Sequence, residues 1–89
     1  MMMRVVTIIN KLGLHARAAT RLVTCASGFE CEVWIGKGER SVNGKSIMGV
    51  LTLAASKGTE LSIKTDGIDE IAAMDAVVEL INDRFGEGE

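Results

Sequence analysis

The segment GLHAR, from Gly13 to Arg17, holds the residues best suited to chemistry in this sequence. His15 is the only histidine in the chain, and Arg17 follows it where an alanine-rich helical pattern begins. The first amide groups of a helix lack partners within the helix and, with the helix dipole, favour an anion such as phosphate. The guanidinium of Arg17 is a permanently charged donor that suits phosphate oxygens. This pattern indicates a site for a phosphoryl group.

A neutral imidazole at such a site is able to accept a phosphoryl group from one partner and pass it to another. Transfer of this kind depends mainly on positioning and on charge stabilisation, so we expect the chain to need no metal ion and no cofactor of its own. The plainer interpretation is that His15 is an ordinary surface residue or a local hydrogen-bonding group.

Other chemistries find less support in the sequence. One histidine and two cysteines without CxxC spacing, Cys25 and Cys31, do not form a typical zinc site, and both cysteines are expected to be reduced thiols. The end of a nucleotide-binding loop is matched at 44–46, but Glu39 stands where that motif needs its first glycine. A net charge of −2 without runs of Lys or Arg argues against a nucleic-acid partner.

Length and composition predict a single globular domain over residues 1–89, with 86–89 as a frayed tail. The chain has 89 residues, of which 47% are hydrophobic, and this suits a packed core. No apolar stretch approaches the roughly 20 residues of a membrane span, and the apolar run at the N-terminus is too short for a signal peptide. We therefore expect a cytoplasmic protein without membrane insertion.

Hydrophobic periodicity predicts the elements that must position His15 and Arg17. Period-two patterns rich in Val and Ile predict four strands, at 3–9, 30–35, 40–43 and 60–64. Helical spacing predicts three helices, at 16–26, 46–53 and 69–81. Ser46 and Asp69 are expected to cap the second and third helices. The order β-α-β-β-α-β-α predicts an α+β domain with one sheet and helices covering one of its faces.

The same patterns predict which side chains face the core. The strands are expected to bury Val6, Ile8, Val33, Ile35, Val42, Leu61 and Ile63. The first and last helices are expected to bury Ala16, Ala19, Leu22, Val23, Ala26, Ala73, Met74, Val77, Leu80 and Ile81.

Two motifs in register, GLHAR and NGKSIMGVLTLAASKGTEL at Asn43 to Leu61, resemble the HPr family. These are the histidine-containing phosphocarriers of the bacterial phosphoenolpyruvate:sugar phosphotransferase system. The resemblance implies an open-faced β-sandwich, with a four-stranded antiparallel sheet and three helices on one face. It implies that His15 is phosphorylated at Nδ1 and that Arg17 contacts the phosphate. Enzyme I is then the donor, and enzyme IIA domains are the acceptors in sugar uptake.

The resemblance also implies a regulatory site and a partner-binding surface on a monomer. Ser46 falls on the serine that an HPr kinase/phosphorylase modifies in many bacteria. The family's contact patch corresponds to Ile47, Met48 and Leu51, and we include Thr20 in the expected surface. The alternatives are that the three apolar residues are ordinary core and that Ser46 only caps its helix.

Two positions depart from the pattern of the family, and other functions remain open. Ala18 replaces a proline that is common after the arginine, and Leu12 replaces a small polar residue. Both changes bear on the transfer rate. One alternative function is a regulatory phosphocarrier of the nitrogen branch, with the same histidine chemistry. A second is a regulatory binding module that acts through Ser46, and a third is an interaction module without any phosphorylation.

Overall fold

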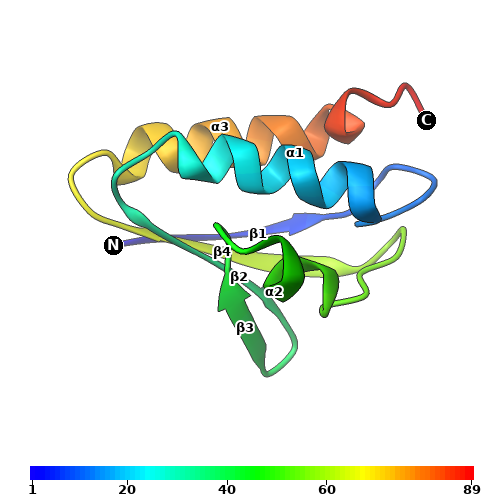
Figure 1. Ribbon diagram of the computed structural model, residues 1–89, viewed down its shortest axis with the longest axis horizontal. Coiled ribbons are helices and arrows are strands. Elements are labelled where there is room, and N and C mark those ends of the chain that lie inside the picture. Colours follow the sequence, from blue (N-terminus) through cyan, green and yellow to red (C-terminus); the bar gives the residue numbers. More distant parts are fainter.

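The computed structural model describes all residues 1–89, and its elements follow the predicted order (Figure 1). The strands are β1 (Met2–Thr7), β2 (Glu32–Lys37), β3 (Arg40–Asn43) and β4 (Glu60–Asp66). The helices are α1 (Ala16–Ser27), α2 (Ile47–Leu51) and α3 (Glu70–Asn82), followed by the short 3-10 turn η1 (Arg84–Gly86). The predicted β-α-β-β-α-β-α order is confirmed, and η1 is an addition that the sequence did not indicate.

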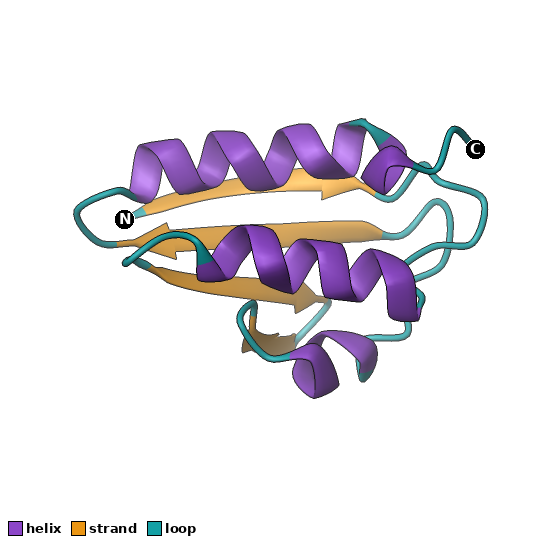
Figure 2. Ribbon diagram, turned by 45° about the horizontal axis from the view of Figure 1, so that its top comes forward, coloured by secondary structure: helices purple, strands orange, loops and turns teal.

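The four strands form one antiparallel sheet in the order β1-β4-β2-β3. Figure 2 shows α1 and α3 side by side across one face of this sheet, with α2 beside α1 at the β3 edge. The expected architecture, an open-faced β-sandwich with three helices on one face, is confirmed. None of the helices is long and apolar enough to cross a membrane.

The core lies between the sheet and the helices. Strand alternation correctly predicted its sheet side, since Val6, Ile8, Val33, Ile35, Leu61 and Ile63 are all buried, whereas Val42 on the short β3 is only partly buried. In α1 the prediction was wrong at one residue near the start: Ala16 is exposed, and Ala18 is buried instead. Ala16 is the first helical residue, and its side chain points outward. In α3 the buried stripe includes Val78, and Leu80 is partly buried.

Asp69 occupies the N-cap position of α3, but it does not cap the helix with its side chain. Its carboxylate instead accepts hydrogen bonds from the backbone N–H groups of Glu30 at 2.8 Å and Cys31 at 2.9 Å. These bonds, that of Glu30 foremost, lower the pKa of Asp69 from its ordinary value. Instead of capping α3, the Asp69 side chain thus connects the start of this helix to the segment before β2. Cys25 and Cys31 are both free thiols.

The C-terminal segment has specific contacts where the sequence predicted a frayed end. Phe85 is fully buried, and its positive φ of 54° turns the chain back toward the loop between β1 and α1. The backbone N–H of Lys11 donates to the carbonyl of Glu89 at 2.6 Å. The segment lies beside this loop because the buried Phe85 completes the core. The polar sequence around Phe85 gave no sign of that burial. This packing places residues 86–89 beside His15.

Candidate functional site

A tight loop between β1 and α1 sets the position of His15. Gly13 has a φ of +67°, and a Cβ atom there would lie 2.6 Å from the carbonyl oxygen of Ala55. Leu14 is buried, and its N–H donates to that same carbonyl at 2.8 Å. The side-chain amide of Asn10 donates to the carbonyl of Gly13, also at 2.8 Å. Because hydrogen bonds hold both Gly13 and Leu14, the backbone enters His15 in a defined direction.

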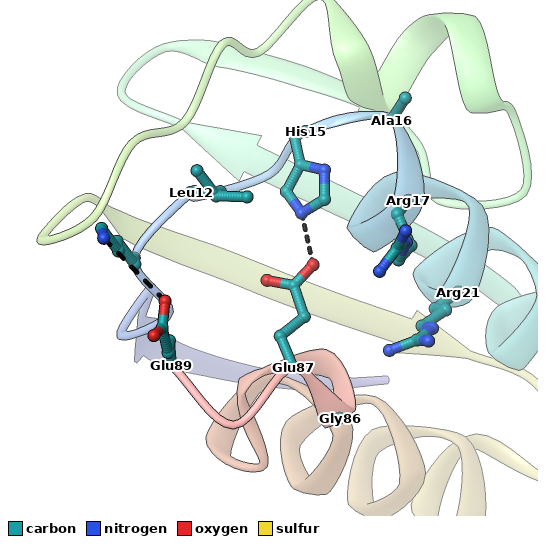
Figure 3. A pocket seen from close by; sticks show the side chains of 9 residues that line it. Leu12, His15, Ala16, Arg17, Arg21, Gly86, Glu87 and Glu89 are labelled. Atoms are coloured by element: carbon teal, nitrogen blue, oxygen red, sulfur yellow. Dashed lines mark hydrogen bonds and ion pairs between the residues drawn. The ribbon is translucent and has the colours of Figure 1, made fainter.

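His15 is the N-cap residue of α1, with extended backbone angles (φ −82°, ψ −178°). Its side chain makes no capping hydrogen bond, so the imidazole leaves the first amide groups of α1 to other acceptors. Its Nε2 contacts the carboxylate of Glu87. Nδ1 lies on the side of the ring that faces Ala16 and the first turn of the helix (Figure 3). The structure therefore engages one ring nitrogen and turns the other toward the helix start.

A cleft of about 580 Å³ opens beside the imidazole. Its lining includes Lys11, Leu12, His15, Arg17, Arg21 and Glu87. Arg17 and Arg21 are one turn apart on α1, and both side chains extend toward the cleft (Figure 3). Together with the helix N-terminus, these cations favour an anion beside His15. No group of three or more His, Cys, Asp or Glu side chains is placed to hold a metal ion.

Glu87 is the acidic residue nearest to the imidazole, and it is held on both carboxylate oxygens. Oε1 accepts a hydrogen bond from the side-chain amide of Asn10 at 2.8 Å, while Oε2 contacts His15. Burial on its own raises the pKa of a glutamate, but the hydrogen bonds from Asn10 and His15 outweigh burial and lower the pKa of Glu87. The carboxylate is therefore ionised near neutral pH.

The proposed regulatory serine precedes α2, and three of the proposed contact residues lie on this helix, which packs against α1. Ser46 is the N-cap of α2, and its Oγ accepts a hydrogen bond from the N–H of Gly49 at 3.1 Å, as expected of a capping serine. Ile47 and Met48 are 42% and 73% exposed, and Leu51 is partly buried. Leu51 follows Ile47 by four positions, so the two share one face of the helix. An exposed apolar surface of this kind suits a binding partner.

The remaining predicted residue, Thr20, is exposed on α1, where its hydroxyl donates to the carbonyl of Ala16 at 2.8 Å. Sequence reasoning missed three residues of the site: Asn10, Arg21 and Glu87. The spacing of four residues from Arg17 was a usable signal for Arg21. Asn10 and Glu87 had none, because their roles depend on contacts far along the chain.

Comparison with known proteins identifies the family. A family model described as the PTS HPr component phosphorylation site matches residues 2–83. The chain is 55% identical to phosphocarrier protein HPr of Neisseria meningitidis serogroup A, over 100% of both chains. Its structure is similar to the crystal structure of HPr-C-His from Thermoanaerobacter tengcongensis, with a TM-score of 0.95, 42% sequence identity and 98% of each chain covered. The chain belongs to the HPr family, the phosphocarriers of the phosphotransferase system.

Two further relatives bear on function and assembly. The chain is 44% identical to phosphocarrier protein NPr of Shewanella violacea, over 94% of this chain and 92% of that protein. It is also 44% identical to an HPr dimer from Thermoanaerobacter tengcongensis, with a TM-score of 0.79 and coverage of 92% and 94%.

Proposed function

We propose that the chain carries a phosphoryl group on Nδ1 of His15, received from enzyme I and passed to enzyme IIA domains in sugar uptake. The observation that carries this proposal is the position of His15 at the start of α1, beside a cleft lined by Arg17 and Arg21. Membership of the HPr family supports the same chemistry.

Each part of the site has a role in this transfer. The Nδ1 lone pair forms the bond to phosphorus, and the leaving group of the donor keeps the electron pair of the bond that breaks. The amide groups at the start of α1 and the guanidinium of Arg17 stabilise the charge on the phosphoryl oxygens. Arg21 adds a second positive charge to the same cleft. The chain thus supplies a nucleophile and a positive environment, and the partner supplies the rest.

The decisive experiment is labelling with enzyme I and radioactive phosphoenolpyruvate. The wild-type chain is expected to take up one phosphoryl group, in a bond that is labile to acid and stable to alkali. His15→Ala is expected to take up none while keeping its circular dichroism spectrum. Because the chain has one histidine, a stoichiometric label on His15→Ala would refute the assignment.

The second candidate function is regulatory transfer in the nitrogen branch, which the similarity to the NPr protein favours. Presenting the phosphorylated chain to sugar-specific and nitrogen-branch IIA domains separates the two functions, since the true acceptor should be phosphorylated faster. Higher identity to a relative named HPr supports the sugar branch.

Regulation, assembly and location complete the proposal. An HPr kinase/phosphorylase would act on Ser46, and Ile47, Met48, Leu51 and Thr20 would contact partners. We place the chain in the cytoplasm as a monomer. Because a related structure is described as a dimer, sedimentation at micromolar concentration is the direct check of that state.

A further inference from the structure

The contact between His15 and Glu87 joins residues that are 72 positions apart. Glu87 also lies beyond the residues that the family model matches, which end at 83. We infer that Glu87 is a positioning residue for phosphoryl transfer: its carboxylate accepts a hydrogen bond from Nε2 of His15 and thereby leaves the lone pair on Nδ1. This inference rests on the proposed function and adds the group that selects the reactive nitrogen.

The carboxylate of Glu87 is built into the fold. Its side chain is only 12% exposed, and the Asn10 amide holds its second oxygen at 2.8 Å. Asn10 itself is fully buried, and its side-chain amide donates to the carbonyl of Gly13, yet its side-chain oxygen Oδ1 has no hydrogen-bond partner. An unpaired buried acceptor costs free energy, so the contacts of the amide nitrogen are what account for an asparagine at this position. One of those contacts orients Glu87.

The backbone of the C-terminal segment is anchored on both sides of Glu87. Phe85 is fully buried, and its carbonyl accepts a hydrogen bond from the guanidinium of Arg21. Beyond it, the carbonyl of Glu89 accepts from the N–H of Lys11. The carboxylate therefore reaches His15 from a segment with fixed ends.

The chemistry follows from the two nitrogens of the ring. A neutral imidazole carries one N–H and one lone pair, and a carboxylate can only accept a hydrogen bond. The contact with Glu87 therefore keeps the proton on Nε2 and the lone pair on Nδ1. As the bond from Nδ1 to phosphorus forms, the ring gains positive charge. The Nε2 proton stays on the ring, and the carboxylate beside it stabilises that charge, as the aspartate of a serine-protease triad does for its histidine.

The competing explanation is that the C-terminal segment only obstructs the site. On that explanation, removal of the carboxylate would leave phosphoryl uptake unchanged or make it faster. If Glu87 positions the ring, removal of the carboxylate makes phosphoryl uptake slower. The direction of the change in uptake rate therefore distinguishes the two explanations.

The test combines a transfer rate with a spectroscopic reading of the ring. Its variants are Glu87→Ala, Glu87→Gln and the control Asp83→Ala, which removes a nearby exposed carboxylate that makes no side-chain hydrogen bond. Because the chain has one histidine, ¹⁵N labelling of that residue gives a single pair of ring nitrogens. Wild type and Asp83→Ala should show a protected Nε2–H correlation, and Glu87→Ala should lose it to exchange with water.

The rate of uptake from enzyme I should fall about tenfold or more in Glu87→Ala, as for other partners that orient a functional histidine. The Glu87→Gln side chain has the same shape and can still accept from Nε2–H, so its rate should lie between those of wild type and Glu87→Ala. This variant also decides the matter if Glu87→Ala folds poorly. An unchanged or faster rate in either Glu87 variant, or an equal loss in Asp83→Ala, would overturn the positioning role alone. A wild-type chain that enzyme I does not phosphorylate would overturn the proposed function and this role together.

Discussion

Gly13 offers the sharpest test of how the fold positions His15. The residue lies two positions before His15, with a φ of +67°. A Cβ atom at this position would meet the backbone of the loop before β4, at 2.6 Å from the carbonyl oxygen of Ala55 and 2.8 Å from the Cα of Ser56. Because these atoms belong to the backbone, Gly13→Ala forces one of the two loops to move.

The cost of Gly13→Ala has two parts. An alanine in the left-handed region costs roughly 1–2 kcal/mol. Forcing an extra methyl group into a packed site costs about 1–3 kcal/mol. Gly38→Ala is the matched control, because Gly38 has a similar φ of +60° and nothing within 4 Å of the added Cβ. We therefore expect losses of about 2–5 kcal/mol for Gly13→Ala and about 1–2 kcal/mol for Gly38→Ala.

Thermal denaturation measures the loss of stability, and the rate of phosphoryl uptake measures the effect on the position of His15. In a domain of this size, 1 kcal/mol corresponds to about 4–8 °C in melting temperature, so the variants are well separated. Gly13→Ala should also slow uptake, because the displaced loop carries His15, whereas Gly38→Ala should transfer at the wild-type rate. Equal destabilisation of the two variants would show that the approach to Ala55 does not constrain this loop.

Substitutions at three further positions have defined expected outcomes. Arg17→Ala should slow phosphoryl transfer by about 10- to 1,000-fold with little change in melting temperature, and an unchanged rate would contradict its role beside the phosphoryl group. Ser46→Ala should lose about 1 kcal/mol, because the hydrogen bond to Gly49 is lost, while transferring normally. Ser46→Asp should fold at least as well as wild type yet accept phosphate more slowly, and a wild-type rate would leave Ser46 as a cap only. Asp69→Asn should reduce stability at neutral pH, as measured by urea denaturation. Hydrogen bonds from the backbone, chiefly that of Glu30, lower the pKa of Asp69 in the folded state. The ionised carboxylate therefore stabilises the fold above the pKa of the unfolded state, and this stabilisation is lost as the pH falls through the lowered pKa of the folded state. Asp69→Asn should therefore show a smaller loss of stability on acidification than wild type.

Local patterns in the sequence predicted most of the architecture. Alternation in β2 and β4 correctly assigned Val33, Ile35, Leu61 and Ile63 to the core, because successive side chains of a strand point to opposite faces of the sheet. Ser46 was correctly predicted as a cap, because its partner Gly49 lies only three residues away. Features of this kind depend on neighbours within about one turn or one strand.

In the candidate site, too, the residues with local roles were predictable from the sequence. The segment from Gly13 to Arg17 is short, so its sequence already indicated a histidine at a helix start with an arginine in the first turn. Arg21 was within reach of the same reasoning, because helical residues four apart lie on one face. The roles of these side chains in transfer remain predictions for the experiments above.

Tertiary structure decided the rest. The carboxylate of Asp69 binds residues 38 and 39 positions away instead of capping its own helix. Glu87 reaches His15 only because Phe85 is buried in the core and turns the chain back. Such contacts are set by how the core packs, since burial of one aromatic side chain determines where the polar residues after it lie. The sequence by itself determined a histidine at the start of a helix in an open-faced sandwich, and packing decided which carboxylate contacts its ring.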